Sequence, residues 1–187
     1  MTLKFRSDAD ASAARQERLD GLFAAHGRAV LAYAVRRTAH EDDAADVLAE
    51  TFLVVWRRLD DVPPGDEALM WLYGVARRVL ANQQRGERRR RRLAERLGRE
   101  LASARPFTAP HDPAVRPVLE AVAGLSPDDR EVLLLAAWEE LSAAEIGTVL
   151  GISQIAARSR LHRARKRLRA VLDGDLDADQ LSFQEAV

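Results

Sequence analysis

The sequence predicts an all-α protein in which two small helical domains are joined by a proline-rich linker. Alanine, leucine and arginine dominate the 187 residues, and aromatic residues make up only 5%, a composition that favours helices over sheets. Apolar residues recur at steps of three and four along most of the chain, as they do in a helix that is buried on one side. Four of the seven prolines lie between residues 101 and 117, where they oppose regular structure.

Three helices are expected before the linker. The first two cover about residues 15–37 and 42–59, each with an apolar stripe at helical spacing. A loop follows because the sequence DDVPPGDE, residues 60–67, contains two prolines and a glycine. The third helix is expected over residues 66–92. It ends in the run RGERRRRR, which must be exposed because it is wholly charged apart from its glycine.

The first helix after the linker is expected to begin at Ser126 and Pro127, since serine is a favoured N-cap and proline a favoured first helical residue. The boundaries that follow from these elements are a flexible leader over residues 1–14, an N-terminal domain over 15–99, a linker over 100–117, a C-terminal domain over 118–172 and an acidic tail over 173–187.

The C-terminal domain is expected to contain a helix-turn-helix. Ser142 and Glu145 fit a capping box at the start of a short helix. Gly151 follows that helix and can adopt the left-handed conformation of a tight turn. Ser153 can then cap the next helix. The apolar stripe of this last helix, again at helical spacing, is Ala157, Leu161, Ala164, Leu168 and Val171.

The arginine-rich helix after Gly151 is a candidate for binding duplex DNA. In a helix-turn-helix the second helix enters the major groove, and its N-terminal residues face the base edges. Glutamine suits adenine, arginine suits guanine, and basic residues elsewhere on the helix reach phosphates. The alternative is a basic surface helix of an ordinary bundle. The predicted duplex-binding residues are Gln154, Arg158, Ser159, Arg160, His162, Arg163 and Lys166.

The third helix is a candidate for binding a single nucleic-acid strand. Aromatic and basic residues at the edge of a loop can stack on unpaired bases and hold the backbone. The alternative for the tryptophan is an ordinary place in the core, because an apolar leucine follows it. The predicted single-strand residues are Trp71, Arg77, Arg78, Asn82 and Arg85.

The second helix carries an acidic face formed by Asp43, Asp46 and Glu50. Such a face would repel DNA and would suit a basic protein partner. It is also what a merely solvated helix surface looks like, and composition alone favours the solvated interpretation.

Several function classes are disfavoured by what the sequence lacks. There is no cysteine, which excludes disulfides, thiol catalysis and cysteine-based zinc sites. The four histidines are far apart, and no glycine-rich phosphate-binding motif is present. We therefore expect no metal, no cofactor and no enzymatic activity. With no apolar signal segment and no run approaching the ~18 apolar residues of a membrane span, we expect a soluble cytoplasmic protein.

The stretches DDAADVLAETFLVVWRRL and WLYGVARRVLANQQRGERRR resemble region 2 of bacterial sigma factors. The stretch LSPDDREVLLLAAWEELSAAEIGTVLGISQIAARSRLHRARKRLR resembles region 4. Their order and spacing, with no region 3 between them, resemble the extracytoplasmic-function (ECF) subfamily of sigma-70. The match spans roughly residues 19–172.

The resemblance implies a promoter-specificity subunit of RNA polymerase. It implies that region 2 binds the β′ clamp helices of core polymerase and captures the melted −10 element with the loop and helix around Asp60 to Arg85. It implies that region 4 binds the β flap and reads the −35 element with the duplex-binding residues. The acidic face would then belong to the core-polymerase interface, supported by Phe52 and Trp56. An anti-sigma factor is a possible further partner.

The chain departs from the usual pattern of this family at several positions. Ala45 stands where an acid is usual and Ala49 where a glutamine is frequent, which weakens the polar part of the clamp contact. Arg78 replaces an asparagine and Asn82 an aspartate, so the −10 reader is more basic. Ala156 replaces a threonine and removes a hydroxyl that could reach a phosphate.

Two other functions are weighed beside this one. A stand-alone helix-turn-helix regulator would bind duplex DNA without polymerase. A sigma-like protein without initiation activity would bind polymerase or an anti-sigma factor and start no transcription.

Overall fold

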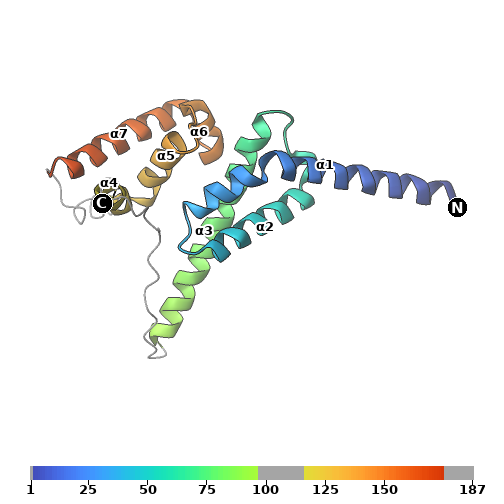
Figure 1. Cartoon of the computed structure of the whole chain (residues 1–187), viewed down its shortest axis with the longest axis horizontal. Helices are drawn as coiled ribbons and strands as arrows, with labels where there is room; N and C mark the ends of the chain where they lie inside the picture. Colours follow the sequence, from blue (N-terminus) through green and yellow to red (C-terminus); the bar gives the residue numbers. More distant parts are fainter. Residues whose placement is uncertain (1, 97–115, 175–187) are drawn as a thin grey trace. The chain divides into compact units, whose positions relative to one another are not determined.

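The computed structural model describes residues 2–96 and 116–174, which fold almost entirely as α-helices (Figure 1). No β-strand occurs within those two ranges, and the all-α prediction is confirmed. The chain divides into two compact units, Met1–Pro106 and Phe107–Val187. Each unit has its own core and is described by itself.

The N-terminal unit contains α1 (Thr2–Val35), α2 (Glu41–Arg57), the short 3-10 helix η1 (Leu59–Asp61) and α3 (Glu67–Arg96). Each of the three α-helices packs against the other two. The rings of Tyr33 on α1 and Tyr73 on α3 stack with their centroids 5.1 Å apart. The fully buried apolar residues of this core include Val30, Tyr33, Val47, Val55, Leu72 and Ala76.

The first helix starts earlier than the sequence predicted. α1 begins at Thr2 instead of near Arg15, so residues 2–14 are helical where a flexible leader was expected. The physical reason is local: the chain has no proline or glycine before Gly21, and alanine, the strongest helix former, recurs between Ala9 and Ala14. Residues 2–14 therefore form a helix although they carry no apolar stripe at helical spacing.

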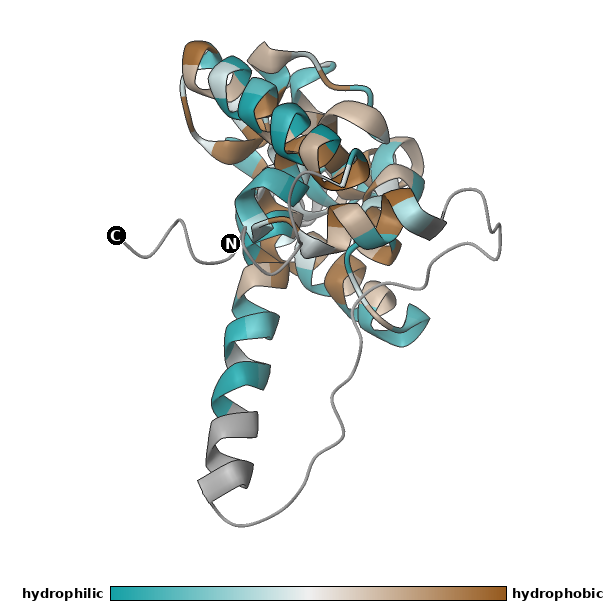
Figure 2. Ribbon diagram, turned by 90° about the vertical axis from the view of Figure 1, so that its left-hand side faces the viewer, coloured by the Kyte–Doolittle hydropathy of each residue, from teal (hydrophilic) through white to brown (hydrophobic). Residues whose placement is uncertain are grey.

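Hydropathy is distributed as expected for small helical bundles. In Figure 2 the turns of α3 that precede its grey end are mostly teal, which marks hydrophilic residues, and Arg85, Glu87, Arg88 and Arg89 are exposed. The prediction that the charged end of this helix lies in solvent is confirmed as far as Arg89. Of the helices that the structure describes, none is both long enough and apolar enough to cross a bilayer.

The C-terminal unit contains α4 (Arg116–Gly124), α5 (Pro127–Ala137), α6 (Ala143–Leu150) and α7 (Gln154–Leu172). The long helix α7 contacts all three of the others and organises the core. The sequence did not predict α4, because prolines crowd the segment before it. The buried apolar residues include Leu119, Val132, Leu135, Ile146, Ala157 and Ala164. Most of the expected linker and acidic tail lie outside the described residues.

Candidate nucleic-acid and protein interfaces

The start of α6 carries the capping box that the sequence predicted. The Ser142 hydroxyl accepts a hydrogen bond from the Glu145 backbone N–H at 3.4 Å, and the Glu145 carboxylate accepts one from the Ser142 backbone N–H at 2.8 Å. Hydrogen bonding to the Glu145 carboxylate from the side chain and the backbone N–H of Ser142 lowers the pKa of Glu145 below its ordinary value, because it favours the charged form.

The turn from α6 to α7 also forms as predicted. Gly151 is left-handed, with φ 69° and ψ 35°, and the Ser153 hydroxyl accepts a hydrogen bond from the Ala156 backbone N–H at 3.2 Å. A left-handed glycine between two capped helices fixes the angle at which α7 leaves α6.

Gly147 is a second glycine that the turn requires, and sequence reasoning missed it. It is buried on α6, and its carbonyl accepts a hydrogen bond from the Ile152 backbone N–H at 2.9 Å. A Cβ at this position would lie 2.8 Å from the Ile152 carbonyl oxygen, closer than carbon and oxygen can approach. The close contact between α6 and the turn therefore depends on the missing side chain.

Helix α7 has an inward side and an outward side. Ala157, Leu161 and Ala164 are buried against the rest of the unit. The outward side leaves six of the seven predicted duplex-binding residues exposed, and these are Gln154, Arg158, Ser159, His162, Arg163 and Lys166.

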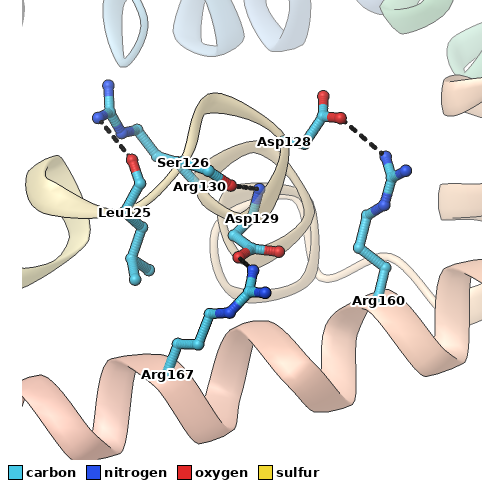
Figure 3. A network of polar contacts seen from close by, with 7 residues as sticks. All are labelled: Leu125, Ser126, Asp128, Asp129, Arg130, Arg160 and Arg167. Atoms are coloured by element: carbon cyan, nitrogen blue, oxygen red, sulfur yellow. Dashed lines mark hydrogen bonds and ion pairs between the residues drawn. The ribbon is translucent and has the colours of Figure 1, made fainter. Parts of the chain in front are cut away.

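Arg160 is placed differently from the other six. It is half-buried, and its guanidinium forms an ion pair with Asp128 of α5 at 3.4 Å (Figure 3). Arg167, two turns further on, pairs with Asp129 of the same helix. Both arginines therefore point toward α5 and away from the outward side, because α5 offers two carboxylates along that flank.

Arg130 ties the start of α5 to the end of α4. Its guanidinium donates a hydrogen bond to the carbonyl oxygen of Leu125 at 3.1 Å (Figure 3). It also donates to the carbonyl oxygens of Val122, at 3.2 Å, and Ala123. Burial lowers the pKa of Arg130 below its ordinary value, although an arginine keeps its charge. These bonds add a side-chain donor to carbonyl oxygens at and just beyond the end of α4, and they hold the helix that contacts α7.

Four of the five predicted single-strand residues lie in one line along α3. Trp71, Arg78, Asn82 and Arg85 recur at steps of seven, four and three, so they share one side of the helix. Arg77 lies off this line and is half-buried. Arg78, Asn82 and Arg85 are exposed, and Arg85 donates a hydrogen bond to the side-chain amide oxygen (Oδ1) of Asn82.

Trp71 is half-buried at the loop edge, where the Arg58 guanidinium lies 5.7 Å from its ring centroid. The indole is thus neither a full member of the core nor a free stacking surface.

The predicted acidic face borders a hollow between α2 and α3 of about 390 Å³. Its carboxylates include one from α3 that the sequence did not suggest, Glu87. Asn82 also faces this hollow, so it lies where two predicted sites meet. The lining residues are Asp43, Asp46, Glu50, Asn82, Gln83, Gly86 and Glu87. With four carboxylates and no basic residue in the lining, the hollow suits a cationic group.

Phe52 and Trp56 lie beneath the surface of α2. Phe52 is 9% exposed and packs edge-on against the Phe23 ring at 4.9 Å. Trp56 is half-buried beneath Arg15, whose guanidinium lies 5.5 Å from its ring centroid. Both side chains support α2 from within. The apolar residue that α2 does present is Leu53, 54% exposed and one turn after Glu50, which sequence reasoning missed.

Among the described residues there is no group of three or more histidine, cysteine, aspartate or glutamate side chains that could hold a metal ion.

Comparison with known proteins agrees with this geometry. Residues 22–90 match the family described as Sigma-70 region 2, and residues 116–168 match Sigma-70, region 4. RNA polymerase sigma factor CarQ of Myxococcus xanthus is 34% identical over 168 residues, which cover 88% of this chain and 94% of CarQ. ECF RNA polymerase sigma factor SigL of Mycobacterium tuberculosis is 31% identical over 170 residues, covering 87% and 93%.

A solved structure shows the same fold. The structure of CnrH in complex with the cytosolic domain of CnrY is similar with a TM-score of 0.61 and 28% sequence identity, covering 90% of this chain and 96% of that one. The regions matched, their order and the relatives together place the protein among non-enzymatic transcription initiation factors. The chain belongs to the extracytoplasmic-function subfamily of the sigma-70 family of sigma factors.

Proposed function

We propose that this sigma factor binds core RNA polymerase and directs it to promoters by reading a −35 element with its C-terminal unit and a −10 element with its N-terminal unit. The observation that carries the proposal is the outward side of α7. It exposes six of the predicted DNA-binding side chains on a helix that a capped, glycine-containing turn presents. The protein would act in the cytoplasm, where polymerase and promoter are.

The −35 element is read by the N-terminal turns of α7. Gln154 and Arg158 lie at that end, where a recognition helix faces base edges, and they suit adenine and guanine respectively. Arg163 and Lys166 lie further along and are placed for phosphates. Arg160 is assigned no DNA contact, because its guanidinium is already paired with Asp128.

The −10 element is captured as a single strand along α3. Arg78 and Arg85 hold the backbone, and Trp71 offers an indole edge beside the loop. Stacking and phosphate contacts would offset the few kcal/mol that each unstacked base costs.

Core polymerase binds the acidic hollow of α2 and α3. A basic side chain of the polymerase would enter among Asp43, Asp46 and Glu50, while Leu53 adds an apolar contact beside them. Complementary charge of this kind steers two proteins together and fixes their register. Because CnrH was solved with the cytosolic domain of CnrY, we also propose that a protein inhibitor, an anti-sigma factor, binds this chain.

Run-off transcription with purified core polymerase tests the proposal. Wild-type chain should give specific transcripts from a promoter that the holoenzyme selects from random duplex DNA. Arg158→Ala should lose about 1–3 kcal/mol of promoter-binding free energy, whereas Arg28→Ala, an exposed arginine on α1, should behave as wild type.

Charge reversal separates polymerase binding from DNA binding. Asp46→Lys with Glu50→Lys should abolish capture of core polymerase, and Glu17→Lys, an exposed acid on α1, should not. Polymerase binding without transcripts would instead identify a sigma-like protein without initiation activity. Duplex binding without polymerase binding would identify a stand-alone regulator.

A further inference from the structure

Ile155 is the most exposed large apolar side chain that the structure describes. It is 76% exposed, although it belongs to the well-ordered helix α7. Holding an isoleucine in water forgoes the free energy of burial, about 1.5–3 kcal/mol for a side chain of this size. No residue within the described range 116–174 covers it, so its surface there is available to a ligand.

Ile155 stands at the head of the outward side of α7. It is the second residue of the helix, and Ser159, His162 and Lys166 follow it at steps of four, three and four. Residues at this spacing form one line along a helix. Three of the four members are predicted DNA-binding residues, and the fourth is the isoleucine.

The surroundings of Ile155 favour a nucleic-acid ligand over an apolar protein surface. The other members of its line are polar or charged, and Arg158 and Arg163 flank the line. A docking site for a protein would need a larger apolar patch than one side chain. The arginines that could crowd it, Arg160 and Arg167, are held on the α5 flank by their ion pairs.

Among the base edges in the major groove, one presents an apolar group. Thymine carries a 5-methyl group there, which cytosine and uracil lack, and apolar side chains contact it. An isoleucine at the N-terminal end of a recognition helix lies at the depth where such edges are met.

We propose that Ile155 contacts the 5-methyl group of one thymine in the −35 element and so determines specificity at that position. This inference rests on the proposed function, since it needs α7 to enter the major groove. It adds a base contact that is not a hydrogen bond. The amide of Gln154 and the guanidinium of Arg158 would select polar base edges, whereas Ile155 would select a methyl group.

The experiment compares the promoters that two holoenzymes select. Core polymerase with the wild-type chain or with Ile155→Ala is incubated with a duplex library randomised across the −35 region, and the bound DNA is sequenced. The Ile155→Ala motif should lose a thymine preference at one position and keep the others. Val118→Ala, an exposed apolar residue on α4, should select the wild-type motif.

A second measurement removes the methyl group from the DNA. Replacing that thymine by deoxyuridine should weaken wild-type binding roughly threefold to fourfold, the effect of one methyl-sized apolar contact. The same replacement should leave Ile155→Ala unaffected. Because Ile155 is exposed, the alanine variant creates no cavity, and an unchanged melting temperature verifies its fold.

The possible results separate the proposal for Ile155 from the proposed function. If wild type and Ile155→Ala select the same motif with the same thymine preference, the proposal for Ile155 is overturned. It is also overturned if both proteins respond equally to deoxyuridine. If the wild-type holoenzyme selects no −35 motif at all, the proposed reading of a −35 element is itself contradicted.

Discussion

Asp129 on α5 and Arg167 on α7 are joined by an ion pair whose carboxylate is only 5% exposed. The Asp129 backbone N–H also donates to the Ser126 hydroxyl, so the same residue takes part in the start of α5 and in its attachment to α7 (Figure 3). Two turns earlier on α7, Arg160 pairs with the exposed Asp128. Asp128 and Asp129 thus each form an ion pair with an arginine of α7, but the Asp128 carboxylate is exposed and the Asp129 carboxylate is buried.

The buried pair should contribute more to stability than the exposed one. Asp129→Ala removes this carboxylate from the partly buried Arg167 guanidinium. We therefore expect the C-terminal unit to lose about 2–4 kcal/mol of unfolding free energy. Asp128→Ala removes a solvated pair and should cost less than about 1 kcal/mol. Amide hydrogen exchange of α5 and α7 measures both values, and equal losses would contradict the ranking.

The exposed pair should limit nonspecific binding to DNA. Asp128→Asn releases Arg160 for one additional phosphate, which would make the slope of log affinity against log salt about 0.9 steeper on duplex DNA of arbitrary sequence. The double variant Asp128→Asn with Arg160→Gln should restore the wild-type slope. A slope that does not change in the single variant would show that Arg160 cannot reach the backbone.

The turn of the helix-turn-helix should not tolerate a methyl group at Gly147. Gly147→Ala forces a Cβ against the Ile152 carbonyl oxygen, and such overpacking costs about 1–3 kcal/mol. Gly21→Ala is the matched control, because nothing lies within 4 Å of a Cβ there and alanine favours the helix by up to about 1 kcal/mol. Thermal unfolding should therefore shift in opposite directions for the two variants.

The capping box should make α6 less stable in acid. The pKa of Glu145 is lowered from its ordinary value of 4.5 by the hydrogen bonds from Ser142. Its stabilising effect is therefore complete above the unfolded-state pKa and is lost as the pH falls through the lower folded-state pKa. Because Glu145 is exposed, solvent keeps the effect small.

Comparing melting temperatures of wild type and Glu145→Gln from neutral pH to about pH 3 isolates this contribution from the other carboxylates. The advantage of the wild type should shrink toward the acid end. A constant difference across that range would mean that the hydrogen bonds do not depend on the charge of Glu145.

The features that the sequence predicted well are those set by near neighbours. Ser142 and Glu145 are three residues apart, and Gly151 and Ser153 lie beside the turn they shape, so their roles could be inferred from local chemistry. The positions of Arg160 and Arg167 could not, because they depend on aspartates of α5 that lie 38 residues away in the case of Arg167. Helical periodicity alone does not tell which flank of α7 meets α5.

The candidate site in the N-terminal unit shows the same limit. The acids of α2 were recognisable as one face, but Glu87 and Asn82 join them only because α3 packs beside α2. Phe52, which was expected to support the interface, is buried in the core, while Leu53, the next residue, is exposed and was not expected there. A shift of one residue on a helix turns a side chain by about 100°, which pattern reasoning at the edge of a stripe cannot resolve.

The two sides of α7 separate the residues that hold the fold from those that we propose contact DNA. Ala157, Leu161 and Ala164 with the two ion pairs keep the helix in place, whereas Ile155 and Ser159 stand in solvent and contribute little to folding. Substitutions at the outward positions therefore leave the stability margin nearly untouched. A lineage descended from this gene could change the promoters it serves one residue at a time, without any intermediate that fails to fold.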